Sequence, residues 1–218
     1  STHKHSTERQ RLRILLPLAE PVGPDAYQAI SRRIASDIGI DLFDDTTYEP
    51  ERLMYWPSTP ADGEYVYTQN DADWLEPKDI LSRYDDWHDV TTWPESSRQA
   101  GIRRTEAKKQ GDPLAKTGII GAFCRAYSID EAIEAFLPDV YEHCSAEGRY
   151  TYKEGSTNAG LVVYENKFAY SHHGTDPISG KLVNAFDLVR IHLYGLQDED
   201  AELQVNKQPS FKAMSELA

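Results

Sequence analysis

Two histidines near the start of the chain, His3 and His5, have the spacing to share a ligand. Residues two positions apart project from the same face of an extended strand, so both imidazole rings could reach one phosphate group or one metal ion. A metal site needs a third ligand, which the neighbouring sequence does not supply. The alternative is a pair of exposed histidines without a ligand, and the spacing alone favours that alternative.

A second group of candidates lies in the segment DLFDDTTYEPER, residues 41–52. It contains three carboxylates within five positions, from Asp41, Asp44 and Asp45, and ends at Arg52. Carboxylates on an irregular segment suit Mg²⁺, which takes oxygen ligands and keeps several waters. The competing interpretation is an acidic turn whose aspartates bond their own backbone, and the pattern by itself favours this turn.

Histidines and cysteines of the C-terminal half form a third group. His172 and His173 are adjacent and would face opposite sides of a strand, so at most one of them could join Cys124, Cys144 or His143 in a site. No pair has the usual zinc-ligand spacing, and we do not expect a zinc site. Cys124 lies in the apolar stretch IIGAFCRAY, which predicts a buried, unreactive thiol rather than a nucleophile.

The loop that follows these histidines is a weaker candidate. We expect Ser171, His172 and residues 174–180 to form a polar rim. This rim is either a nucleic-acid contact or a turn whose hydrogen bonds are satisfied locally, and the sequence leaves both open.

The net charge of −13 argues against nucleic-acid binding over the whole surface, because phosphate contacts need Lys and Arg. Residues 62–95 are strongly acidic, whereas residues 98–116 are basic. Such a change of sign indicates a boundary between two units. The basic stretch is the candidate nucleic-acid contact, through Arg103, Arg104, Lys108 and Lys109.

The elements that must position these residues indicate an α+β fold. We predict strands over 11–16, 52–57, 63–69, 149–153, 159–165 and 167–173, and helices over 23–40, 76–84, 128–137 and 184–195. Ser128 and Glu131 match a capping box, Asn184 is a predicted helix cap, and a tight turn is expected at Glu165–Asn166. Residues 1–85 form a first unit, 86–117 an aperiodic basic linker, and 118–218 an accessory α+β domain.

Three segments together resemble a known family. STHKH, RLRILLPL and DLFDDTTYEPERLMYWPS look like the second half of the archaeo-eukaryotic-type primase (prim-pol) domain of phage and plasmid proteins. Ser1-Thr2-His3 matches the family's small-x-His motif, and Phe43-Asp44 matches its hydrophobic-Asp motif, with Asp45 as an alternative. The later stretches KTGIIGAFCRAYSIDEAIEAFLPDVYE and FAYSHHGTDPISGKLVNAFDLVRIHLYG resemble phage virulence-associated E-like primase–helicase proteins.

This resemblance implies a nucleotidyl-transfer site in DNA replication. It implies that His3 contacts the phosphates of a nucleoside triphosphate and that Asp44 or Asp45 binds Mg²⁺ or Mn²⁺. Further phosphate contacts could come from Ser1, Arg11, Arg13 and Arg52. The expected partners are a single-stranded DNA template and a helicase-like ATPase domain of the same protein, in the cytoplasm of a bacterial host.

The family's first motif, a pair of acidic residues on a strand, has no counterpart in the sequence. We therefore expect an internal fragment of such a protein, inactive by itself, because the metal chemistry needs those ligands. One alternative is a non-catalytic module that binds nucleic acid or assembles a replication complex. Another is a metal hydrolase built on His3, His5 and the aspartates.

Overall fold

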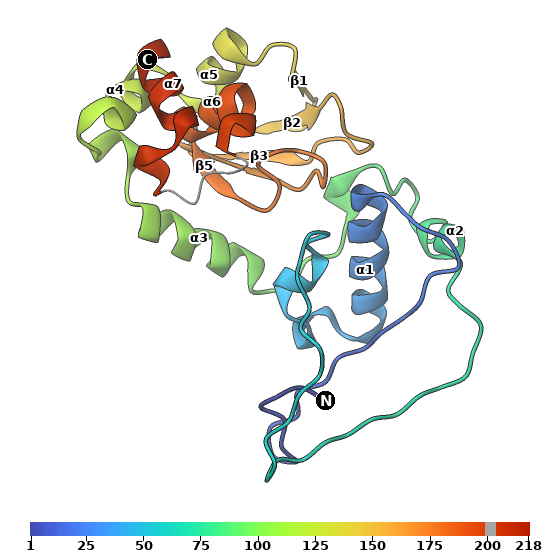
Figure 1. The fold of residues 1–218 in the computed structure, drawn as a ribbon. Coiled ribbons are helices and arrows are strands. Elements are labelled where there is room, and N and C mark those ends of the chain that lie inside the picture. Colours follow the sequence, from blue (N-terminus) through green and yellow to red (C-terminus); the bar gives the residue numbers. More distant parts are fainter. Residues whose placement is uncertain (199–203) are drawn as a thin grey trace.

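The fold mixes helices with one antiparallel sheet, which confirms the predicted α+β class (Figure 1). The computed structural model describes residues 1–198 and 204–218, except for the side chains at positions 100, 102–104 and 106. A C-terminal lobe contains the sheet and several helices, and an N-terminal lobe surrounds the long helix α1, Pro24–Ile38 (Figure 1). None of the helices within these described residues has the length and apolar character required to cross a bilayer.

The sheet is an antiparallel meander, in which each strand pairs with the next one along the chain. Its strands are β1 Tyr141–His143, β2 Arg149–Tyr152, β3 Leu161–Tyr164, β4 Phe168–Ser171 and β5 Leu182–Asn184. Three of these strands were predicted from the sequence, whereas the short β1 and β5 were not. Glu165 and Asn166 have φ angles of 52° and 53°, as a type I′ hairpin turn requires, and this confirms the predicted turn between β3 and β4.

Four helices cover the sheet on one side (Figure 1). They are α4 Gly118–Ala126, α5 Ile129–Phe136, α6 Ala185–Tyr194 and α7 Pro209–Leu217. The capping box of Ser128 and Glu131 begins α5, and the Asn184 side chain accepts from the Asp187 N–H to begin α6, as predicted. Their apolar faces bury one core with the sheet, which includes Phe123, Ile129, Ile133, Leu161, Phe186, Leu188 and Met214.

The N-terminal lobe has a smaller core around α1. Proline at the first position suits the start of this helix, and Gly39 ends it with a φ of 128°, which only glycine adopts easily. Beside α1 lie α2 Pro77–Leu81 and the 3₁₀ turns η1 Ile40–Leu42, η2 Asp45–Tyr48 and η3 Val90–Thr92. The buried residues Ala29, Tyr84, Val90 and Trp93 hold the lobe together.

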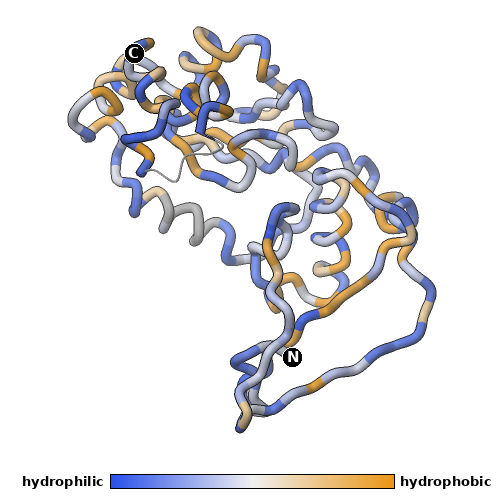
Figure 2. The backbone as a smooth tube through the Cα atoms, in the orientation of Figure 1, coloured by the Kyte–Doolittle hydropathy of each residue, from blue (hydrophilic) through white to orange (hydrophobic). Residues whose placement is uncertain are grey.

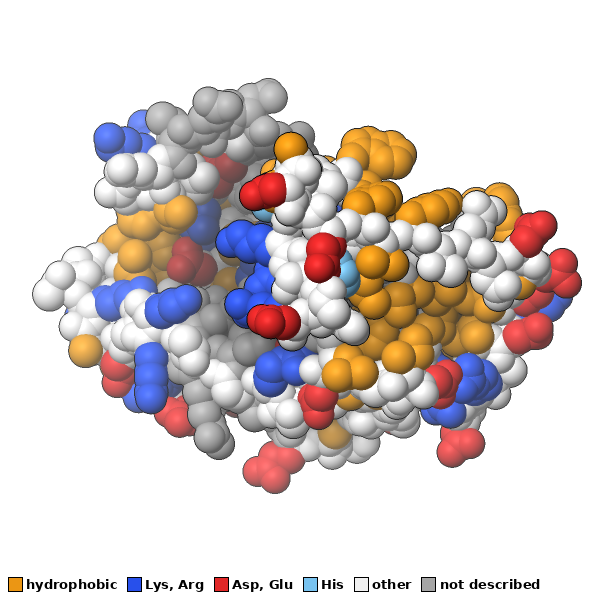
Figure 3. Space-filling model, turned by 90° about the horizontal axis from the view of Figure 1, so that it is seen from below, with side chains coloured by type: hydrophobic (Ala, Val, Ile, Leu, Met, Phe, Trp, Pro, Cys, Tyr) orange, Lys and Arg blue, Asp and Glu red, His pale blue; other side chains and the backbone are white. Residues whose placement is uncertain are grey.

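The three strands predicted within residues 1–85 are absent from the described structure, so this part of the prediction is wrong. Residues 11–16, 52–57 and 63–69 are extended but do not pair into strands. Their apolar side chains remain in solvent, and Trp56 is 92% exposed. The first of these segments is the hydrophobic stretch that runs toward α2 in Figure 2, and hydrophobic side chains also gather over this lobe in Figure 3. A strand pattern gives a strand only where a partner supplies the other half of the hydrogen-bond ladder.

The connection between the lobes is more regular than predicted. The expected linker, residues 86–117, contains η3, the helix α3 Gln99–Gln110 and the 3₁₀ turn η4 Pro113–Ala115. Helix α3 bridges the lobes (Figure 1). Its sequence is polar over most of its length and has no broad apolar face, so periodicity could not reveal it.

Candidate functional site

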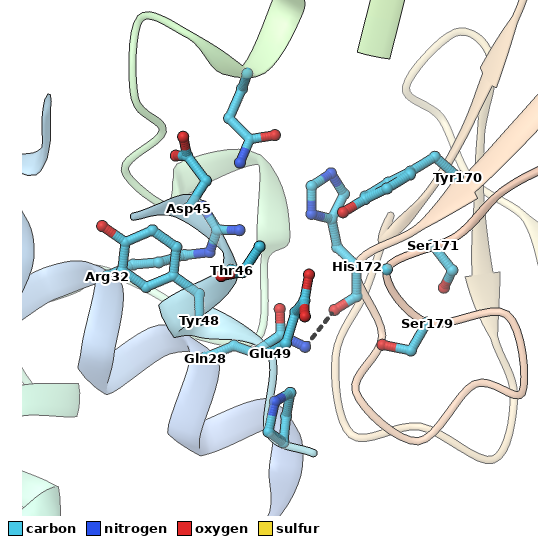
Figure 4. Close-up of a pocket in the computed structure, with 13 residues that line it drawn as sticks. Gln28, Arg32, Asp45, Thr46, Tyr48, Glu49, Tyr170, Ser171, His172 and Ser179 are labelled. Carbon is cyan, nitrogen blue, oxygen red and sulfur yellow. Dashed lines mark hydrogen bonds between the residues drawn. The ribbon is translucent and has the colours of Figure 1, made fainter. Parts of the chain in front are cut away.

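A cavity of about 90 Å³ lies where the N-terminal lobe meets the end of β4 (Figure 4). Helix α1 and the segment around η2 form one side of it, and the end of β4 with the loop that follows forms the other. The start of α3 closes a third side through Gln99. Besides Pro50 and Gly180, the lining residues have polar side chains and are Gln28, Arg32, Asp45, Thr46, Tyr48, Glu49, Gln99, Tyr170, Ser171, His172 and Ser179.

Buried hydrogen bonds hold the two lobes against each other beside this cavity. Asp25, 2% exposed, lies in the first turn of α1 and accepts from the Ser156 N–H at 3.0 Å, the Ser156 hydroxyl at 2.7 Å and the Gly174 N–H at 2.5 Å. One turn later, the Gln28 amide donates to the His172 carbonyl at 3.1 Å. The walls of the cavity are therefore fixed by contacts between residues far apart in the sequence.

Arg32 contributes a buried cation to the cavity, since only 4% of the residue is exposed. Its guanidinium lies over the Tyr48 ring, 4.7 Å from the centroid, and donates to the Pro94 carbonyl at 3.1 Å. Figure 4 shows this side chain reaching toward the cavity from α1, opposite His172 and Tyr170. These contacts hold its orientation, because a cation over an aromatic face is attracted by the ring quadrupole.

The three clustered aspartates have different environments. Asp45 is anchored in the fold, because one carboxylate oxygen accepts from the Ser96 hydroxyl at 2.5 Å and the other pairs with Arg98 at 3.1 Å. Asp44 is exposed and caps η2, with its Oδ1 accepting from the N–H and hydroxyl of Thr46. A bond of this kind, between an aspartate and the backbone two residues later, is what the acidic-turn interpretation of residues 41–52 predicted.

Asp41 is held by partners that are distant in the sequence, Ser97 and Arg98. Hydrogen bonds from the Ser97 N–H and hydroxyl lower the pKa of Asp41 below its usual value. The Arg98 side chain lies 4.0 Å away and favours the charged form as well.

The N-terminal candidates lie on the extended part of the lobe. His3 is exposed, and its neighbour Ser1 pairs with the backbone of Val66. The Nδ1 atom of His5 accepts from the Arg11 N–H at 3.0 Å, so this histidine has a structural role in the loop.

The predicted phosphate-contacting arginines are held in separate places. The Arg13 side chain donates to the Tyr55 carbonyl, and Arg52 lies 3.9 Å from the Glu49 carboxylate. The backbone of Arg11 accepts from the Thr2 N–H at 3.0 Å. Of these contacts, the one between Arg13 and Tyr55 joins residues 1–13 to the extended segment 52–57.

The structure brings only part of the predicted site to one place. Asp45 lines the cavity, whereas His3 and Asp44 do not belong to its lining among the described residues. Among the residues that the structure describes, no hydrogen bond or ion pair joins His3 to Asp44 or Asp45. Within residues 1–198 and 204–218 no cluster of three His, Cys, Asp or Glu side chains has a metal-binding arrangement.

The basic stretch occupies α3 and the turns after it. Lys108 and Lys109 are exposed in the last turn of the helix, where positive charge also suits the helix dipole. The predicted contacts Arg103 and Arg104 lie outside the described side chains.

His172 and His173 point in different directions, as expected for adjacent residues. His172 lines the cavity and lies 3.7 Å from Glu95. His173 is buried, with its Nε2 accepting from the Tyr152 N–H and its Nδ1 bonded to the Thr157 hydroxyl, and burial lowers its pKa. An imidazole that accepts at Nε2 in this way is neutral.

Sequence reasoning missed a buried polar cluster between β1, α6 and the loop that follows β4. The Tyr141 hydroxyl donates to Asp176 at 2.7 Å and lies 2.8 Å from the Nε2 atom of His192. Burial opposes ionisation of Asp176, but its interactions with His192 and its hydrogen bonds with Ile178 and Ser171 together outweigh burial and lower the pKa of the carboxyl. The three residues belong to three elements, so no local spacing could have indicated the cluster.

Cys124 is buried in α4, as predicted. Burial raises the pKa of its thiol, which disfavours the nucleophilic thiolate. The structure therefore agrees with an unreactive thiol.

Comparison with known protein families assigns part of the chain. Residues 1–96 match the model of the VapE N-terminal domain, which links this part of the chain to VapE-like proteins. The matched range includes His3, the aspartate cluster, α1 and α2. No curated protein and no solved structure matches the chain.

Proposed function

We propose that the chain is part of a phage-type DNA replication protein and supplies nucleotide and divalent-metal contacts for template-dependent nucleotidyl transfer. The observation that carries this proposal is the match to the VapE N-terminal domain over residues 1–96. That range contains both segments that resemble the primase motifs, around His3 and around Asp44.

The environments of the two aspartates favour Asp44 as the metal ligand. Both oxygens of Asp45 are already engaged by Ser96 and Arg98. Asp44 is exposed, and the two bonds from Thr46 occupy only its Oδ1. Mg²⁺ is commonly held by one or two carboxylates together with waters and substrate phosphates, so a single carboxylate oxygen fits part of such a site.

The exposed histidine suits a phosphate contact. An imidazole N–H of His3 could donate to a phosphate oxygen, and Arg11 and Arg13 lie on the segment paired with it. A bound Mg²⁺ or Mn²⁺ would neutralise charge on the transferred phosphoryl group. The acidic pair and the helicase-like ATPase that the resemblance implies would come from other parts of such a protein.

Binding of a fluorescent nucleoside triphosphate, followed by anisotropy with Mn²⁺ or with EDTA, tests this proposal. We expect His3→Ala to weaken binding about tenfold or more, since one charge-assisted hydrogen bond contributes about 1.5–3 kcal/mol. Asp44→Asn should remove the difference between Mn²⁺ and EDTA, and Lys4→Ala, an exposed neighbour, should change neither. Equal affinities of the wild type and His3→Ala would remove His3 from the proposed site.

A second candidate function is non-catalytic binding of single-stranded nucleic acid through α3. The exposed Lys108 and Lys109, on a helix at the surface between the lobes, favour it. We expect affinity to fall steeply with salt concentration, because backbone contacts release counterions. Lys108→Glu with Lys109→Glu should flatten that dependence, and binding that is independent of salt would exclude this function.

A further inference from the structure

We propose that the cavity between the lobes binds a phosphoryl-sized oxyanion, as free phosphate or as the terminal phosphate of a nucleic acid. This site is separate from the nucleotide contacts proposed at His3 and does not depend on them. Its walls come from α1, η2, the start of α3 and the end of β4, so it exists only when both lobes are folded together.

The hydrogen-bond donors of the cavity suit an anion. Arg32 carries a permanent positive charge and is 4% exposed, so its charge acts in a poorly solvated place. Across the cavity, Figure 4 shows Tyr170, His172 and Ser179 on the side formed by β4 and its following loop. Hydroxyl and imidazole groups at these positions can donate to the oxygens of a tetrahedral anion.

Two carboxylates also line the cavity, and their environments limit their repulsion. Asp45 is bonded to the Ser96 hydroxyl and paired with Arg98, so its charge is largely balanced. The Glu49 side chain is 35% exposed and lies 3.9 Å from Arg52. Solvent and ions screen a carboxylate in such a position, whereas the buried guanidinium of Arg32 is screened much less.

The size of the cavity limits what it can hold. Its volume is about 90 Å³. A cavity of about 150 Å³ is known to hold benzene, so a whole nucleobase does not fit here. A phosphate group with its four oxygens does fit, and the rest of a longer ligand would extend into solvent.

Titration calorimetry and thermal unfolding with sodium phosphate, at constant ionic strength adjusted with chloride, test this inference. We expect saturable binding and a melting temperature that rises with phosphate but not with chloride, because a ligand of the folded state stabilises it. A short oligonucleotide with a 5′-phosphate is compared with the same oligonucleotide without it. This comparison distinguishes free phosphate from the terminal phosphate of a nucleic acid as the ligand. Absence of saturable binding for phosphate and for the 5′-phosphorylated strand would overturn the proposal.

Three substitutions locate the site. Arg32→Met should weaken phosphate binding at least tenfold, whereas Arg33→Met should leave it unchanged, because Arg33 pairs with Asp37 and lies over the Tyr84 ring rather than in the cavity lining. Glu49→Gln should strengthen binding about threefold, because it removes a repulsive charge. The glutamine variant keeps the test decisive if Arg32→Met does not fold. Weaker binding by Glu49→Gln, or equal binding by both arginine variants, would exclude an anion in this cavity.

Discussion

The buried carboxylate of Asp25 should be one of the largest single contributions to stability in the chain. Substitution by alanine removes an acceptor of three hydrogen bonds from Ser156 and Gly174. Two of the three donors are backbone N–H groups, and leaving each one buried without an acceptor costs about 1–3 kcal/mol. We therefore expect Asp25→Ala to lower the free energy of unfolding by about 3–5 kcal/mol, out of the ~5–15 kcal/mol that is typical of native proteins.

Urea denaturation followed by tryptophan fluorescence measures this loss. The matched control is Asp37→Ala, on the same helix, whose side chain is 39% exposed and pairs with Arg83 at the surface. Exposed ion pairs contribute about 0–1 kcal/mol, so this variant should unfold near the wild-type midpoint. If Asp25→Ala cost less than about 1 kcal/mol, the hydrogen bonds between the lobes would not stabilise the fold as argued.

Three further outcomes are expected. Gly160→Ala should lower the melting temperature, because its Cβ would lie 2.7 Å from the His173 ring, whereas Gly101→Ala, which meets nothing within 4 Å, should raise it. His173 has a lowered pKa in the folded state, so the unfolded chain takes up the proton first as pH falls below ~6.5, and the free energy of unfolding should decrease there. Urea titrations should show this decrease in the wild type and not in His173→Gln. Ellman's reagent should label Cys144 in the native protein and reach Cys124 only after unfolding; fast native labelling of Cys124 would contradict its burial.

Local signals in the sequence predicted the C-terminal lobe well. The Ser128 capping box, the Asn184 cap and the Glu165–Asn166 turn are each encoded by residues within a few positions, and all three are found in the structure. The extended segments of the N-terminal lobe have an equally good strand pattern. They fail to pair because pairing depends on a partner strand, which local sequence does not specify.

The candidate site could be predicted only in part. Asp45 and His172 were both recognised as polar candidates, but their positions in one cavity depend on packing between distant segments. The bond from Gln28 to His172 spans 144 positions, and Arg32 lies within a regular helical pattern with no local sign of a role. Arg32 matters to the cavity because it is buried. Arginine is usually exposed, so nothing in the sequence indicated this burial.

The interlocking of α1 with the loops around Ser156 and Gly174 bears on where the chain can be divided. The family match ends at residue 96, yet the side chains of Asp25 and Gln28 form hydrogen bonds with residues beyond position 150. A protein truncated at that boundary would expose a carboxylate and an amide that water must then solvate. The smallest independently folding piece should therefore retain the whole β-meander together with α1. If limited proteolysis cuts the chain near residue 96, the N-terminal and C-terminal fragments should remain associated.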